Sequence, residues 1–251
     1  MRWLPAILVL LALAALLLGL RLRHERLEYR LLAVRPDVAG ADPALVSFAT
    51  AEAKPVYAKN CAACHGADLH GNVALGAPDL ADSHWLYGTG TVYDIERTIL
   101  YGIRSGQAHA HNVTEMPAYG IQGRLTPGQI DSVVQYLMKL NGRPYRAGAA
   151  NVGQELFYGA PNCSDCHGSD AHGDSDYGAP DLTDNVWDNG GSEQQIYDSI
   201  YNGVHRMMPA WFGVLSLGQI RALAVYIHAV SHAPPPAKAE SGAGAATGVT
   251  Y

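Results

Sequence analysis

The sequence predicts an all-α protein in which one membrane-spanning helix precedes two small, tandem helical domains. The stretch from Leu4 to Leu20 is apolar and uncharged, as expected of a membrane helix. A seven-residue motif, NCAACHG at 60–66, returns as NCSDCHG at 162–168, which indicates a duplication. Apolar residues after each copy recur with helical spacing, and the Gly- and Pro-rich stretches between them favour ordered coil over strands.

The N-terminal 26 residues are predicted to form a transmembrane anchor with its flanks. At ~1.5 Å per residue, Leu4 to Leu20 reaches ~26 Å as a helix, close to the thickness of a hydrocarbon core. A cleaved signal peptide is the alternative, but the apolar run exceeds the usual ~7–15 residues and no small-x-small cleavage site follows the run before Arg21. Residues 27–50 contain a polar segment followed by a stretch rich in Ala, Pro and Asp, and they are predicted to be a stalk.

The duplication continues through matching motifs after each copy. They are GAPDL at 76–80 and 178–182, Trp85 and Trp187, and MPAY at 116–119 and MPAW at 208–211. The offset between copies is constant through the tryptophans and shorter at the Met-Pro pairs, because the first copy has an extra loop, RSGQAHAHNVTE. We therefore predict a first domain over 51–146, a second over 147–233 and a disordered tail over 234–251.

Two helices are expected in each copy after the cysteine motif. Capping patterns mark where they begin, because a Ser or Thr is followed three residues later by Asp or Gln. The four capping residues are Thr91, Thr126, Ser192 and Ser216. Apolar residues at helical spacing follow the last cap of each copy, from Ile130 to Met138 and from Ile220 to Ile227.

Composition restricts the function. The chain has 23 Asp and Glu against 17 Lys and Arg, so it lacks the cationic excess that nucleic-acid binding requires. Each domain has some ninety residues and much coil, and a domain of that kind buries little apolar surface. Such scaffolds usually need a disulfide, a metal or a cofactor to hold them together.

All four cysteines of the chain lie in the two Cys-x-x-Cys-His units. A thioredoxin-like pair would sit in a strand-helix context that this sequence does not offer, and a zinc site would draw ligands from two such pairs or from spaced histidines. Covalent haem attachment accounts for every residue of the motif: two thiols form thioethers and the adjacent histidine is the proximal iron ligand. The sequence thus predicts two covalently bound haem c groups. The residues concerned are Cys61, Cys64 and His65, and Cys163, Cys166 and His167.

The favoured sixth ligands are Met116 and Met208. Each precedes a proline, whose ring restricts the preceding residue to extended conformations and helps to hold the thioether in place. Histidine ligation at one haem is the alternative, because His109, His111 and His205 lie near the Met-Pro pairs. Met138 is expected in the helix core.

The residues NCAACHG, ALGAPDL and GAPDLTDNVWDNGGSEQQIYDSIYNGVHRMMPAW resemble the dihaem subunit III of cbb3-type cytochrome c oxidases. The resemblance covers about residues 55–230 and implies two tandem class I cytochrome c domains. It implies electron relay from a donor cytochrome to the catalytic subunit of a terminal oxidase, at the bacterial inner membrane with the haem domains on the periplasmic side. It groups the site residues in chain order, Met116 with Cys61, Cys64 and His65, and Met208 with Cys163, Cys166 and His167.

Two other functions stay open from the residues alone. A dihaem cytochrome of this kind can serve a periplasmic dehydrogenase, and a dihaem peroxidase would need one iron with a displaceable sixth ligand. We expect an electron-transfer subunit that does not catalyse on its own, because two six-coordinate irons offer no position for a substrate.

Overall fold

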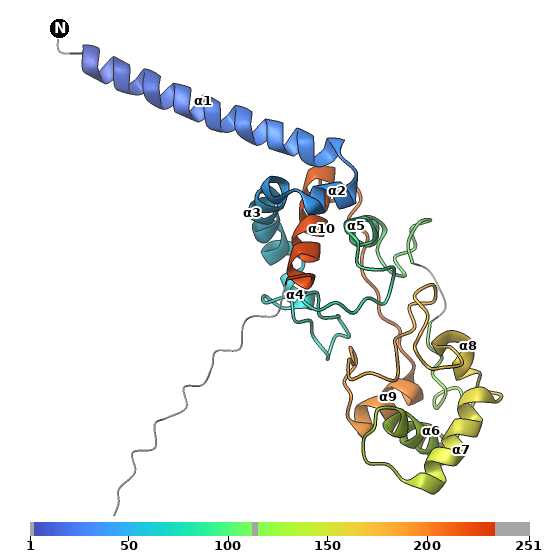
Figure 1. Ribbon diagram of the computed structural model, residues 1–251. Helices are drawn as coiled ribbons and strands as arrows, with labels where there is room; N and C mark the ends of the chain where they lie inside the picture. Colours follow the sequence, from blue (N-terminus) through green and yellow to red (C-terminus); the bar gives the residue numbers. More distant parts are fainter. Residues whose placement is uncertain (1–2, 112–114, 234–251) are drawn as a thin grey trace, which may run out of the picture.

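Figure 1 shows the computed structural model, which describes residues 3–111 and 115–233. Within these residues the chain forms helices joined by coil and isolated β-bridges, and the all-α prediction is confirmed. The predicted tail, 234–251, lies outside the described residues. The helices are α1 (Leu4–Ala33), α2 (Pro36–Ala41), α3 (Pro43–Asn60), α4 (Ala62–His65), α5 (Val92–Tyr101), α6 (Pro127–Leu140), α7 (Ala147–Tyr158), α8 (Cys163–His167), α9 (Glu193–Asn202) and α10 (Leu217–Ser231).

Helix α1 is the candidate membrane anchor. It projects from the rest of the molecule (Figure 1). Its stretch from Ala6 to Ala33 is long and apolar enough to cross a membrane, and the most apolar part of it buries no side chain against the protein. The helix continues past the apolar run through Arg21 to Ala33, so its charged last part extends beyond the hydrocarbon.

The predicted stalk over residues 27–50 is wrong, because these residues fold and pack. Pro36 and Pro43 each begin a helix, a position where proline's missing N–H is no loss. The Asp42 side chain caps α3 by accepting from the backbone N–H of Ala44 at 2.9 Å. Leu45 and later alanines on the same face of α3 are buried. The segment is therefore part of a helical core and not a loose connector.

Two helical units follow the anchor (Figure 1). In the anchor-proximal unit, which contains α2, α3, α4, α5 and α10, the C-terminal helix α10 packs on α3 and α5. Ile220 and Leu223 of α10 share a buried cluster with Leu45, Ile95 and Ile99. Helix α10 belongs to the second copy of the repeat. Helix α5 belongs to the first copy, and α3 leads into the cysteine motif of that copy.

The anchor-distal unit contains α6, α7, α8 and α9. Helix α6 of the first copy packs on α7 and α9 of the second. Side chains fix this pairing: Gln135 donates to Glu193 at 3.1 Å, and Asn141 donates to the backbone carbonyl of Leu182 at 2.6 Å. Met138 is buried in this core, as expected.

The two copies thus exchange their C-terminal halves, and the contiguous domains expected over 51–146 and 147–233 are not the units that pack. The short connection 141–146 keeps the consecutive helices α6 and α7 side by side, which is the usual outcome for neighbouring elements. The chain crosses between units twice, and the crossing segments meet at antiparallel bridges between Ile103 and Met208 and between Met116 and Val204.

The predicted helix starts are confirmed. Thr126, Ser192 and Ser216 each form a full capping box, in which the Ser or Thr side chain and the Gln three residues later bond to each other's backbone N–H. Thr91 accepts from the backbone N–H of Asp94.

Arg221 joins the anchor to the anchor-proximal unit. It lies on α10 and is 8% exposed, as is Glu96 on α5, to which it donates at 2.7 Å. Its guanidinium also donates to the backbone carbonyls of Leu31 and Val34 at the end of α1, each at 3.0 Å. A cation here satisfies carbonyls that have no partner within the helix and favours the negative end of the helix dipole.

Candidate haem sites

Each Cys-x-x-Cys-His unit forms one short helix that presents its histidine in a fixed tautomer. Nδ1 of His65 donates to the backbone carbonyl of Pro78 at 3.2 Å, and Nδ1 of His167 donates to that of Pro180 at 3.1 Å. Burial lowers the pKa of both imidazoles. Each ring is therefore neutral with its Nε2 lone pair available, which is the form that ligates iron.

The two GAPDL motifs supply these proline carbonyls, a role that sequence reasoning missed. The signal was present, since each proline lies thirteen residues after the histidine that it orients. A repeated spacing of that kind indicates a shared contact.

The surroundings of the cysteines disfavour the thiolate chemistry of a redox pair. Burial raises the pKa of Cys61 and of Cys163 to about 11, so both are held as neutral thiols. All four cysteines lie in the described part of the chain, and none forms a disulfide. Among the described residues there is also no group of three His, Cys, Asp or Glu side chains placed to hold a metal ion, which disfavours a zinc site.

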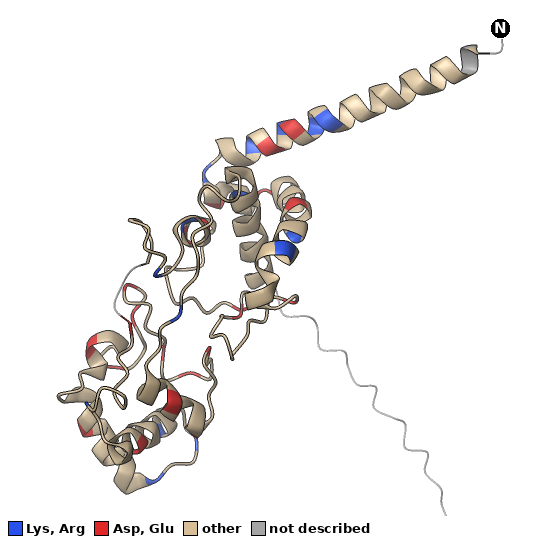
Figure 2. Ribbon diagram, turned by 180° about the vertical axis from the view of Figure 1, so that it is seen from behind, with Lys and Arg blue, Asp and Glu red and all other residues tan. Residues whose placement is uncertain are grey.

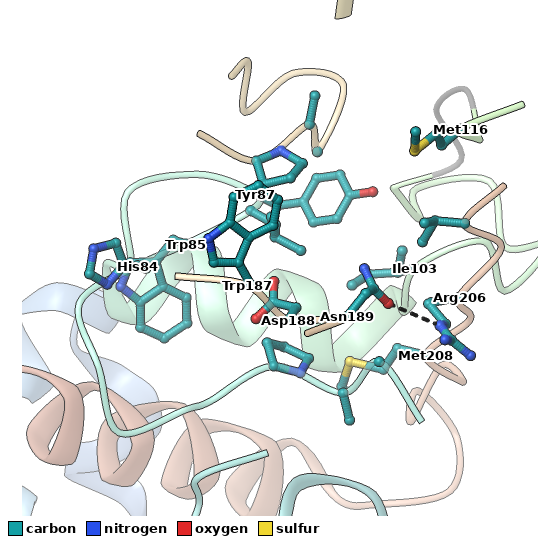
Figure 3. Close-up of a pocket in the computed structure, with 18 of the residues that line it drawn as sticks. His84, Trp85, Tyr87, Ile103, Met116, Trp187, Asp188, Asn189, Arg206 and Met208 are labelled. Carbon is teal, nitrogen blue, oxygen red and sulfur yellow. Dashed lines mark hydrogen bonds between the residues drawn. The ribbon is translucent and has the colours of Figure 1, made fainter. Parts of the chain in front are cut away.

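A cavity of about 520 Å³ runs between the two units, and both Cys-x-x-Cys-His units line it. Its wall also includes Met116, Met208, Trp85 and Trp187, which Figure 3 shows among the lining side chains. Most of the remaining lining is apolar. The predicted site residues of both copies are thus brought to one cavity, although they come from four separate stretches of chain.

Each methionine packs beside the Cys-x-x-Cys-His unit of the other copy. Met208 packs in the cluster that contains Cys61 and Trp85, and Met116 packs in the cluster that contains Cys163. This packing differs from the grouping expected from chain order, because the Met-Pro segments cross between units together with the helices that follow them.

Backbone bonds at the crossing hold the methionines in place. Met208 exchanges two hydrogen bonds with Ile103, both at 3.0 Å, and the carbonyl of Met116 accepts from the N–H of Val204 at 3.2 Å. Gly102 has a positive φ of 75°, and a Cβ there would lie 2.4 Å from the carbonyl oxygen of Met208. Only glycine allows the chain to approach the Met-Pro turn this closely.

The three histidines that could replace a methionine are engaged elsewhere. His111 stacks on Tyr87 with ring centroids 4.3 Å apart and lies 3.2 Å from the Thr98 hydroxyl. His109 packs edge-on against Tyr101, and His205 contacts the carboxylate of Glu115. None of the three lines the cavity between the units.

Buried donors along the cavity fit a ligand with acceptor groups. The indole N–H groups of Trp85 and Trp187 are buried, and neither has a hydrogen-bond partner among the described residues. A buried unpaired donor costs ~1–3 kcal/mol, so such groups normally meet a partner. The carboxylates of a haem would supply acceptors, and the apolar wall would cover its ring. When bound, haem supplies a one-electron redox centre, and the residues present fit two of them.

The cavity also contains an acidic side chain with an altered pKa. Burial, together with the nearby carboxylates of Asp82 and Asp184, raises the pKa of Asp188 to about 6. His84 lies between the copies, 3.6 Å from Asp82 and 3.7 Å from Asp184. These groups place titratable charge where the two units meet.

Comparisons with known proteins agree with this site. Residues 50–141 match the cytochrome c family, and residues 148–227 match the family of cbb3-type cytochrome c oxidase subunit III. The FixP subunit of a cbb3-type cytochrome c oxidase from Bradyrhizobium sp. (strain ORS 278) is 42% identical over 190 residues, 75% of this chain and 63% of its own length. The CcoP subunit from Cereibacter sphaeroides is 38% identical over 188 residues, 75% of this chain and 63% of its own.

A CcoP subunit from Rhodobacter capsulatus is 39% identical over 215 residues, 82% of this chain and 71% of its own. The chain therefore spans between three fifths and three quarters of the length of these relatives. Its two family matches and its two Cys-x-x-Cys-His units identify it as a dihaem c-type cytochrome. We conclude that the chain belongs to the family of cbb3-type cytochrome c oxidase subunit III.

Proposed function

We propose that this protein relays electrons from a donor cytochrome to the catalytic subunit of a cbb3-type terminal oxidase. One haem is held by Cys61, Cys64, His65 and Met208, and the other by Cys163, Cys166, His167 and Met116. The observation that carries the proposal is the shared cavity, since both histidines and both methionines line the same space. Two irons with His and Met ligands have no free position for a substrate, so they carry electrons without other chemistry.

A peroxidase function is less well supported. It requires a displaceable ligand, and the His-rich loop that would provide one is occupied: His111 is stacked on Tyr87 and hydrogen-bonded to Thr98. We place the haem units on the periplasmic side of the inner membrane, with α1 as the anchor, because c-type haems are attached outside the cytoplasmic membrane.

The proposal is tested on the complex purified from membranes in mild detergent. Denatured protein should retain two porphyrins per chain by mass, and the native complex should reduce oxygen with a donor cytochrome as the electron source. Carbon monoxide should not bind rapidly to either ferrous c-type haem. A bare polypeptide mass, or rapid binding of carbon monoxide to a c-type haem, would reject the carrier function.

The net negative charge of the molecule lies on the anchor-distal unit. Residues 116–202 contain 11 of the 23 Asp and Glu but only 4 of the 17 Lys and Arg. Figure 2 shows acidic segments over this unit, whereas the anchor carries both basic and acidic segments. We propose that the donor cytochrome docks on this unit through a basic face, since complementary charge steers association.

Two of the acidic residues near the second Cys-x-x-Cys-His unit have neutral counterparts near the first unit. Asp174 and Asp176 stand where the first copy has Asn72 and Ala74. The turn itself is the same in both copies: the N–H of Asp176 donates to Asp174 at 2.8 Å, and the N–H of Ala74 donates to Asn72 at 3.0 Å. The first copy therefore shows that the neutral residues support this turn.

We expect Asp174→Asn with Asp176→Ala to slow reduction of the protein by a basic donor cytochrome, roughly tenfold at low ionic strength, because two steering charges are lost. Stopped-flow rates measured over a range of salt concentrations check this, and the difference should shrink as salt rises. The reverse change in the first copy, Asn72→Asp with Ala74→Asp, is the control and should raise the rate much less. Equal rates for the Asp174/Asp176 variant and the parent would contradict docking at this unit.

A further inference from the structure

The segment that carries Met208 continues into an exposed apolar turn. Phe212, Val214 and Leu217 are 60%, 69% and 54% exposed, and they lie within six residues of each other. We define these three residues as the apolar turn. The corresponding loop of the first copy, GIQGRL at 120–125, flanks its exposed Ile121 with Gln122 and Arg124. Exposed apolar side chains gathered together commonly mark a site of protein contact.

The apolar turn is held rigidly. The backbone N–H of Phe212 donates to the carbonyl of Leu100 at 3.0 Å, and that of Trp211 donates to the carbonyl of Ile99 at 3.1 Å. Both acceptors lie in the last turn of α5. The turn is closed by a 3.0 Å bond from the N–H of Val214 to the carbonyl of Trp211. A preformed surface of this kind loses little conformational entropy on binding.

The apolar turn also lies beside the anchor. Helix α10 begins at its end, and a Cβ on Gly218 would be 2.9 Å from the Glu28 carboxylate of α1. Arg221, one turn further along α10, bonds to the end of α1. The position of the apolar turn relative to the membrane is therefore fixed by the anchor joint.

Its height argues for a protein partner and against lipid. Glu28 lies eight residues beyond Leu20, the last residue of the apolar run. At ~1.5 Å per residue this is ~12 Å past the hydrocarbon, whereas the headgroup layer is only ~5–7 Å thick on each side. The water-side surface of a neighbouring membrane protein reaches this height. Permanent interfaces between subunits are also more apolar than transient ones.

We propose that the apolar turn is the docking face for the membrane-embedded catalytic subunit of the oxidase. This assignment rests on the proposed function and adds to it which face of the molecule meets which partner. The acidic anchor-distal unit meets the transient donor, and the apolar anchor-proximal face meets the permanent partner. The turn begins four residues after Met208, so this face adjoins the site built from Cys61, Cys64 and His65.

The test compares complexes purified through a tag on this chain in mild detergent. Phe212→Ser with Val214→Gln should lower the catalytic subunit recovered per chain at least tenfold, with an equal loss of oxygen reduction. The content of haem c and the near-infrared sulfur-to-iron band should stay unchanged, which shows that the chain is folded. The matched control is Ile121→Ser, because Ile121 is 65% exposed on the anchor-distal unit. It should recover as much catalytic subunit as the parent.

Equal recovery with the Phe212/Val214 variant, or an equal loss with Ile121→Ser, would overturn the assignment. The assignment would also fail if the parent chain, purified alone in detergent, were a dimer and the variant a monomer. The face would then bind a second copy of this chain. Quenching of a fluorophore at position 214 by quencher-labelled lipid headgroups in protein-free vesicles would show that the turn contacts lipid instead, and would also overturn the assignment. If the parent itself recovers no oxidase subunit, the proposed function fails and not merely the docking face.

Discussion

Replacing Met208 with alanine should free the sixth position of the haem at Cys61 and Cys64, and leave the haem at Cys163 and Cys166 unchanged. Met116→Ala should do the reverse. The physical reason is the exchange of halves: Met208 packs with Cys61 and Met116 with Cys163. Each variant should lose the sulfur-to-iron charge-transfer band of one haem completely and lower its reduction potential, since Met ligation raises it.

A loss of half of the sulfur-to-iron charge-transfer band does not identify the haem that changed. The two haems must therefore be distinguished by a second spectral feature. Cys64→Ser leaves the first haem held by one thioether, and the vinyl group that remains shifts its absorption to longer wavelength. In the double variant Cys64→Ser with Met208→Ala, carbon monoxide should bind to the shifted haem. In the matched variant Cys64→Ser with Met116→Ala, it should bind to the unshifted one. The opposite pattern would restore the pairing by chain order and reject the exchange.

Local features of the structure could be predicted because the residues that produce them are near in sequence. The capping boxes at Thr126, Ser192 and Ser216 need only four consecutive residues each. The two Cys-x-x-Cys-His helices are equally local. The Ala-, Pro- and Asp-rich composition of 27–50 predicts a stalk, but Pro36 and Pro43 each stand at a helix start, and Asp42 before Pro43 is an N-cap residue.

The exchange of halves could not be predicted because the duplication hides it. Both copies carry the same order of motifs, so the motifs alone do not show which methionine lies beside which histidine. The decision lies in contacts between distant residues, such as Gln135 with Glu193 and Asn141 with Leu182. The orientation of the two histidines could have been predicted from the sequence, because each lies thirteen residues before the proline whose carbonyl it contacts. The buried pair of Glu96 and Arg221 joins residues that are 125 positions apart in the sequence. A contact of that kind leaves no local signal from which it could be predicted.

That buried pair should dominate the stability of the anchor-proximal unit. Glu96→Gln leaves the charge of Arg221 buried without a counter-charge, and we expect a loss of ~3–5 kcal/mol in the free energy of unfolding. Denaturation of the haem-loaded full chain in detergent, followed by haem absorbance, measures this loss. The control is the exposed pair of Asp131 and Arg146 on the anchor-distal unit, where Asp131→Asn should cost at most ~1 kcal/mol.

A second variant separates loss of the ion pair from loss of packing. Glu96→Leu with Arg221→Met removes both charges and keeps apolar volume, so it should be more stable than Glu96→Gln, because no charge stays buried alone. It also removes the bonds to Leu31 and Val34 that hold the end of α1. Backbone amide exchange at the end of α1 should therefore be faster in the double variant than in the parent, while exchange in α6 and α7 stays the same. A double variant less stable than Glu96→Gln would reject the cost of the lone buried charge, and unchanged exchange at the end of α1 would show that Arg221 does not fasten the anchor.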